Sequence, residues 1–321
     1  RRVRAGEPSI LEKKSVGASQ KDFERRFAEL EEYAATEGLS LDGPREVDLT
    51  VVDRLDAYYL DGWSSEVGEK LLAAVRFARP EYGRGGKWSL PRSLRAMRGY
   101  RKAAPAASKA AIPMSWVKAL LTAMSWRGRR DVAKLCACQV DLMTRPGELL
   151  KTRVEDVTFS GGRASVLLHP CDREERSKTG ITDDVIVADD EEMPTSDILR
   201  EALRGKRPGE LVFGILNRDL REVFRQAVED LGLQNVDLVA YQLRHAGAAH
   251  SALVRRRSIA DIQKRLRHST LSSTRRYEKH GRMQRLLSQS PAEVTTYANR
   301  IDASFKAMLC GRGSVLPPPK A

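Results

Sequence analysis

Tyr241-Gln-Leu-Arg244-His245 is the most informative segment of this chain, and Leu266-Arg-His268-Ser269 and Arg275-Arg-Tyr277 follow it within a basic, helix-rich region. Tyrosine, arginine and histidine together suit the attack of a tyrosine hydroxyl on a phosphodiester. A phenol is a weak nucleophile, and a phosphate under attack is highly charged. The reaction therefore requires a positioned tyrosine among cationic donors, and we expect further cations elsewhere in the chain.

Length and charge narrow the class of protein. The 321 residues are enough for two domains, each with its own core. The 56 Lys and Arg exceed the 43 Asp and Glu and give a net charge of +13, which indicates a polyanionic partner, nucleic acid ahead of an anionic membrane surface. The sequence has no run of about 18 apolar residues and no apolar segment typical of a secretory signal. We therefore expect no membrane span and an intracellular protein located with DNA, in the cytoplasm and nucleoid or in the nucleus.

The cysteines do not form a metal-binding pattern. Cys136 and Cys138 are too close for the usual zinc pair, and neither Cys171 nor Cys310 supplies a second pair nearby. Reduced, mostly buried thiols are the expectation. We predict no metal site and no cofactor.

The first part of the chain has a helical pattern. Residues 1–17 are polar and are expected to form a disordered arm. From 18 to 104 the apolar residues recur at helical spacing and predict an all-helical domain. A linker rich in small residues and proline follows over 105–113. The helical domain carries a basic run that fits either a phosphate-facing surface or a solvated helix face, and its candidate DNA contacts are Arg92, Arg95 and Arg98.

The second part, 114–310, is predicted to be mainly α with a small antiparallel β-sheet. Residues 154–159, a turn at 160–163 and residues 164–168 predict a hairpin, and 184–188 predict a third strand. Helical patterns surround these strands on both sides. The segment 311–321 is rich in glycine and proline and is expected to be a disordered tail.

Several short motifs occur in a fixed order. Arg145-Pro-Gly-Glu148 precedes Asp156, and a lysine lies between the second and third predicted strands. His268 and the tyrosine of the last segment are nine residues apart. In this order and spacing the chain resembles the tyrosine recombinase (phage integrase) family, whose motif positions are occupied here by Arg145, Glu148, Asp156, Lys178, Arg244, His245, His268 and Tyr277.

The resemblance implies a helical core-binding domain, a catalytic domain and a role for each motif residue. Tyr277 would attack the phosphorus and form a 3′-phosphotyrosine. Arg145 and Arg244 would each present a planar fork to phosphate oxygens, Lys178 would protonate the leaving 5′-oxygen, and His268 would donate to a non-bridging oxygen. The supporting residues would be Glu148, Asp156 and His245. The partners would be double-stranded DNA and three further protomers in a homotetramer on synapsed DNA, and neither metal nor ATP would be needed.

The chain departs from the family pattern at three positions. Tyr241 replaces a histidine, and with a reference pKa of about 10 it is a poorer base. Arg267 replaces a glycine and is expected to contact DNA. Thr152 replaces a leucine. Arg255 and Arg256 are candidate phosphate contacts, or a solvated tip.

Three alternatives stay open. A relative that binds DNA without cutting it is favoured by Tyr241. A type IB topoisomerase would share the chemistry but act as a monomer. A helical scaffold without a DNA function would show no salt-dependent DNA binding.

Overall fold

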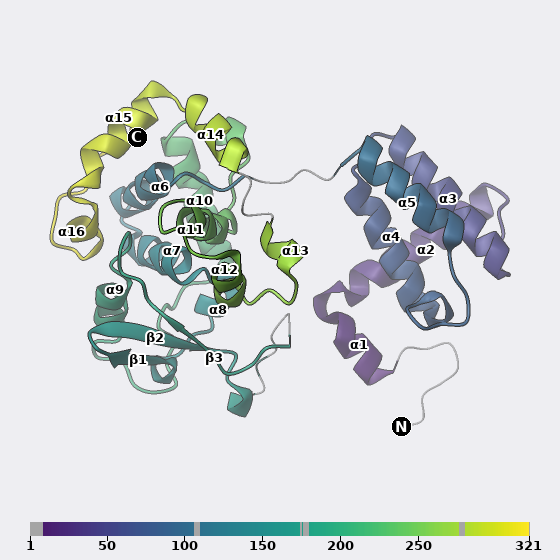
Figure 1. The fold of residues 1–321 in the computed structure, drawn as a ribbon, viewed down its shortest axis with the longest axis horizontal. Helices are drawn as coiled ribbons and strands as arrows, with labels where there is room; N and C mark the ends of the chain where they lie inside the picture. Colours follow the sequence, from purple (N-terminus) through teal and green to yellow (C-terminus); the bar gives the residue numbers. More distant parts are fainter. Residues whose placement is uncertain (1–8, 106–109, 174, 176–179, 276–279, 321) are drawn as a thin grey trace. The chain divides into compact units, whose positions relative to one another are not determined.

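The structure is a computed structural model that describes residues 9–105, 110–173, 175, 180–275 and 280–320. Lys178 and Tyr277 lie outside the described residues. The chain divides into two compact units, Arg1–Ser108 and Lys109–Ala321 (Figure 1). The predicted fold class is confirmed: the chain is mainly α-helical and has one three-stranded antiparallel sheet. Within the described ranges, no helix combines the length and apolar character that a bilayer-spanning segment needs.

The first unit is a bundle of helices. Its α-helices are α1 (Ile10–Val16), α2 (Gln20–Thr36), α3 (Pro44–Leu60), α4 (Ser65–Ala78) and α5 (Pro91–Ala103). Helix α2 packs on α4 and α3 packs on α5, around a core that includes Leu30, Leu55 and Leu71. Buried Asp48 on α3 accepts hydrogen bonds from the backbone N–H groups of Arg92 and Ser93, at 2.9 and 2.8 Å. This carboxylate fixes the start of α5, as an N-terminal cap does.

Helix α1 lies within the segment that was expected to be a disordered arm. The Ser9 hydroxyl accepts a hydrogen bond from the Glu12 backbone N–H at 3.1 Å, and the Glu12 carboxylate accepts one from the Ser9 N–H at 2.6 Å. This capping box satisfies two otherwise unpaired donors. It accounts for the helix that the polar composition of residues 1–17 did not predict.

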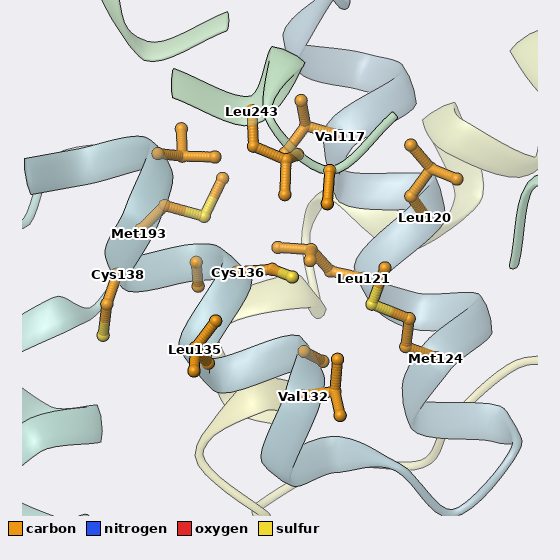
Figure 2. Packing of buried hydrophobic residues seen from close by; sticks show 14 of the residues in the cluster. Val117, Leu120, Leu121, Met124, Val132, Leu135, Cys136, Cys138, Met193 and Leu243 are labelled. Atoms are coloured by element: carbon orange, nitrogen blue, oxygen red, sulfur yellow. The ribbon is translucent and has the colours of Figure 1, made fainter. Parts of the chain in front are cut away.

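The second unit is built around α6 (Met114–Trp126) and α7 (Arg130–Leu142). Both helices are buried along most of their length, and Leu121 and Cys136 meet in the core between them (Figure 2). Burial raises the pKa of the Cys136 and Cys138 thiols, as expected for structural cysteines. The remaining α-helices are α8 (Pro146–Leu149), α9 (Thr195–Ala202), α10 (Asn217–Asp230), α11 (Gln242–Leu253), α12 (Ile259–Leu266), α13 (Leu271–Thr274), α14 (His280–Ser288), α15 (Ala292–Asp302) and α16 (Phe305–Leu309).

The sheet has the order β1-β2-β3, with strands β1 (Val157–Ser160), β2 (Arg163–Leu168) and β3 (Asp184–Val187). Val166 in the central strand lies opposite Val157 in β1 and Ile186 in β3. Gly161 and Gly162 form the tight β1–β2 turn with positive φ angles of 56° and 81°, which glycine adopts without strain. Helix α9 packs on β2 and joins the sheet to the helical core.

The end of the chain folds back on its own unit. Helices α15 and α16 pack on α6 and bury Tyr297 and Phe305 (Figure 1). The segment predicted to be a disordered tail also packs here, since Leu316 contacts the core and its carbonyl accepts a hydrogen bond from the Tyr297 hydroxyl at 2.9 Å. The backbone N–H of Lys320 donates to the Asp230 carbonyl at 3.0 Å. Apolar residues among the glycines and prolines give this tail its contacts.

Candidate active site

Arg145 lies in the connection between α7 and α8. Met143 ends α7 in the left-handed conformation, with a φ of 51°, and Arg145 then begins α8 as its N-cap. The Glu148 carboxylate accepts from the Arg145 backbone N–H at 2.6 Å and from its Nη1 at 2.8 Å. Glu148, which the resemblance implied as a supporting residue, therefore fixes both the backbone and the guanidinium of Arg145.

Arg244 connects three sequence motifs. It lies on α11, and its side chain is completely buried. Its Nη1 donates to the carbonyl of Met143, just before Arg145, at 2.9 Å, and its Nη2 donates to the carbonyl of Leu266 at the end of α12. The same Nη2 lies 3.4 Å from Nε2 of His268. The residues around Arg145, Arg244 and His268, which are far apart in sequence, therefore meet at one guanidinium.

His268 is half-buried among cations. Burial and the positive charges of Arg244, Arg145 and Arg267 lower its pKa to about 4, so the ring is neutral near pH 7. The Arg244 guanidinium can only donate hydrogen bonds. Because its Nη2 lies beside Nε2 of His268, we assign Nε2 as an acceptor. Nδ1 then carries the proton and donates to the Thr274 hydroxyl at 3.1 Å. The sequence predicted that His268 donates to a non-bridging oxygen without specifying a ring nitrogen, and donation from Nε2 requires the other tautomer.

Glu148 lies at the centre of this cluster and has a partner that was not predicted. His169, which follows β2, places Nε2 at 3.4 Å from Glu148 Oε1. Although burial opposes it, the charge of Arg267 and the donors of Arg145 hold the pKa of the Glu148 carboxyl below its ordinary value. No sequence motif marks His169, because only the fold brings the end of β2 beside α8.

The Arg267 side chain lies inside the unit, although the sequence predicted a DNA contact. It is 3% exposed, and its Nη2 is 2.5 Å from Glu148 Oε2. Arg255 is also engaged within the unit: it forms ion pairs with Asp189 and, at 2.9 Å, with Glu191. Arg256 is exposed. Charge and sequence spacing alone do not reveal which acidic residue forms an ion pair with an arginine in the folded protein.

Asp156 and His245 have different surroundings. Asp156 is buried and receives two hydrogen bonds from Arg173, both of 2.7 Å, so it holds the connection that leads from β2 toward the predicted Lys178. The His245 ring packs edge-on against the Tyr241 ring, with 5.3 Å between centroids. Tyr241 is 43% exposed and borders a cavity of about 680 Å³, whose wall also includes Pro146 beside Arg145.

The three predicted contacts on α5 all face solvent. Arg92, Arg95 and Arg98 are exposed on the first unit, whereas neighbouring Arg101 forms an ion pair with Glu69 at 2.8 Å.

Among the residues that the structure describes, no three His, Cys, Asp or Glu side chains are grouped so as to hold a metal ion. The described part of the site is therefore a set of arginines and histidines held by one carboxylate.

Comparison with known proteins identifies this arrangement. The sequence profile of the phage integrase family matches residues 116–283, slightly more than half of the chain. The chain belongs to the phage integrase family. The match spans Arg145, Arg244 and His268, the residues that meet in the structure, and it also includes Lys178 and Tyr277. A comparison with curated protein sequences finds no match.

Solved structures support this family's fold for the chain. The XerH site-specific recombinase in its post-cleavage complex with a palindromic difH substrate is similar with a TM-score of 0.57 and 17% identity, over 75% of this chain and 71% of that chain. A lambda integrase dimer bound to a COC′ core site is similar with a TM-score of 0.53 and 17% identity, over 83% and 92% of the two chains. At this identity the likeness concerns the fold.

Proposed function

We propose that this phage integrase family member is a site-specific DNA recombinase that cleaves and rejoins double-stranded DNA through a 3′-phosphotyrosine intermediate on Tyr277. The main support is that the buried Arg244 guanidinium joins the Arg145 and His268 segments. Two arginines that share the Glu148 carboxylate suit a phosphate whose charge grows during attack. No ATP is required, because the phosphotyrosine link conserves the energy of the broken bond.

The proposed roles follow the chemistry of each group. Arg145 and Arg244 stabilise the charge on the non-bridging oxygens, and one such donor contributes about 3 kcal/mol in oxyanion holes. Lys178 protonates the departing 5′-oxygen. We assign His268, whose Nε2 lies 3.4 Å from Arg244 Nη2, to a non-bridging oxygen of the same phosphate, and Glu148, Asp156 and His245 to the support of these groups.

The proposed partner is duplex DNA. The net charge is +13, and the XerH and lambda integrase structures are complexes with DNA sites. We propose that residues 18–104 form a core-binding domain and residues 114–310 the catalytic domain, and that four protomers assemble on synapsed DNA inside the cell.

A covalent trap tests this function. The protein is incubated with duplexes that carry a nick near the cleavage position, so that the short 5′ fragment diffuses away and religation stops. We expect a denaturant-resistant protein–DNA complex linked to the 3′ end of the cut strand, at preferred sites in a random duplex pool. If no tested DNA gives this complex, the recombinase assignment is wrong for those substrates. Relaxation of supercoiled plasmid without site preference or synapsis would favour a monomeric topoisomerase.

The arginines of α5 give a binding prediction. Replacement of Arg92, Arg95 and Arg98 by glutamine should reduce the slope of log affinity against log salt by about 3, because each phosphate contact contributes roughly one counterion. Fluorescence anisotropy over a salt series measures the slope. Arg101→Gln is the matched control, since Arg101 already pairs with Glu69 and should change the slope little. Equal slopes for the triple variant and wild type would remove α5 from the DNA interface.

Tyr241 gives a test of the non-cutting alternative. Because histidine has a pKa near neutrality, Tyr241→His should speed single-turnover cleavage by about 100-fold if proton removal limits the rate. Tyr241→Phe, which removes only the hydroxyl, is the control and should not gain activity. Equal rates for all three proteins would show that proton removal by this residue does not limit cleavage.

A further inference from the structure

Arg267 occupies an unfavourable backbone position for a side chain. It caps the C-terminus of α12 with a φ of 52°, in the left-handed region that glycine adopts most easily. The family resemblance expected glycine there, and yet this chain places a long cation that is 3% exposed. The contacts of the guanidinium must offset both the backbone strain and the burial of charge.

These contacts converge on Glu148. Arg267 Nη2 lies 2.5 Å from Glu148 Oε2, and Nη1 donates to the Arg265 carbonyl at 3.1 Å. The same Oε2 accepts from the backbone N–H of Arg145 at 2.6 Å and is 3.8 Å from Arg244 Nη1. One carboxylate is therefore shared by Arg267 and by the two arginines proposed to bind the scissile phosphate.

We propose that Arg267 is a positioning residue of the phosphate site, which acts through Glu148 on the guanidinium of Arg145. Arg267 supplies a cation that compensates the negative charge of the buried Glu148 carboxylate. The positive charges of Arg145 and Arg244 are then less offset by Glu148 and can act on the phosphate. It also holds Oε2 at the start of α8, where Arg145 is fixed. This inference rests on the proposed recombinase function, and it replaces the expected DNA contact of Arg267 with a role inside the unit.

The loss of Arg267 has a specific consequence. Glu148 would remain buried with Arg145 and Arg244 as its neighbouring arginines. Without Arg267, less of the negative charge of Glu148 is compensated, so this charge lowers the positive potential around Arg145 and Arg244. Those cations would then offer less positive charge to a phosphate. Removal of the carboxylate in the same protein should relieve the defect.

Three variants test this coupling: Arg267→Gln, Glu148→Gln and the double variant. Single-turnover cleavage of the nicked duplex is measured at saturating protein, and thermal unfolding reports whether each variant folds. We expect Arg267→Gln to slow cleavage by about 100-fold. If the two effects were independent, the fold losses of the single variants would multiply. We expect the double variant to cleave at least about 10-fold faster than that multiplied loss predicts. Independent losses that simply multiply would overturn the proposal.

DNA binding separates a positioning role from a direct contact. The salt slope of Arg267→Gln should equal that of wild type, because the Glu148 carboxylate, 2.5 Å from Arg267 Nη2, already neutralises this cation. A slope reduced by about 1 would show a direct phosphate contact and would contradict the proposal.

A titration of the free protein tests the location of Arg267 without any cleavage. The charge of Arg267 contributes to the low pKa of His268, so Arg267→Gln should raise that pKa in a histidine NMR titration. His250, on α11, is the internal reference, since its pKa is set by burial and by Glu192. If Arg267→Gln left the pKa of His268 unchanged, the proposed position of Arg267 would be refuted. If wild type cleaves no DNA, the recombinase function fails, while this titration still tests Arg267.

Discussion

Tyr277→Phe should abolish the covalent protein–DNA complex. The phenol oxygen is the only atom of this side chain that can attack phosphorus, and phenylalanine retains the ring without it. We expect the trapped complex to fall below detection on nicked duplexes, a loss of at least about 1,000-fold. Non-covalent affinity should be unchanged, because neutral tyrosine adds no charge to the DNA contact. Denaturing gels and anisotropy measure the two quantities.

Tyr297→Phe is the matched control for this experiment. Tyr297 is the other tyrosine near the end of the chain, but it is buried on α15 and its hydroxyl donates to the Leu316 carbonyl at 2.9 Å. This variant should still form the complex, at a small cost in stability of about 1 kcal/mol. Persistence of the complex in Tyr277→Phe, or its loss only in Tyr297→Phe, would assign the nucleophile elsewhere.

The sequence was sufficient to identify the residues that meet at the site, but not how they are held. Arg145, Arg244 and His268 were predicted because their order and spacing resemble the motifs of the phage integrase family. The role of Glu148 as a shared partner depends on where α8, α11 and the end of α12 pack, and local patterns do not contain that information. His169 was missed for the same reason.

Two other differences have local causes. Ser9 and Glu12 have the spacing of a capping box, a signal that was present within the residues assigned to a disordered arm. Arg267 was expected to contact DNA because it adds charge beside the site, and Arg255 was either a phosphate contact or part of a solvated tip. Arg267 is buried against Glu148 and Arg255 is partly buried against Asp189, and both carboxylates are distant in sequence. Compositional reasoning therefore failed where one buried carboxylate determined the outcome.

The packing that brings Arg244 to the site depends on Gly247, and Gly247→Ala should disrupt it. Gly247 lies one turn after Arg244, where α11 crosses α7. A Cβ atom at this position would lie 2.0 Å from the Val140 carbonyl oxygen of α7. The obstacle is backbone, so the helices must separate, and Arg244 Nη1 would move away from the Met143 carbonyl that it contacts.

We expect Gly247→Ala to lower the free energy of unfolding of the second unit by about 3 kcal/mol, which corresponds to a decrease in Tm of roughly 6–12 °C. Cleavage should fall further than the unfolded fraction explains, because the surviving folded protein holds Arg244 out of place. Gly281→Ala is the matched control in the same unit: Gly281 is the second residue of α14, where no described atom lies within 4 Å of an added Cβ, so alanine should leave the free energy of unfolding nearly unchanged. Calorimetry with single-turnover cleavage at a temperature where both variants are folded measures the two effects. A Gly247→Ala protein that unfolds and cleaves like wild type would show that α7 and α11 are not in close contact. The placement of Arg244 in the proposed site, which depends on that contact, would then be wrong.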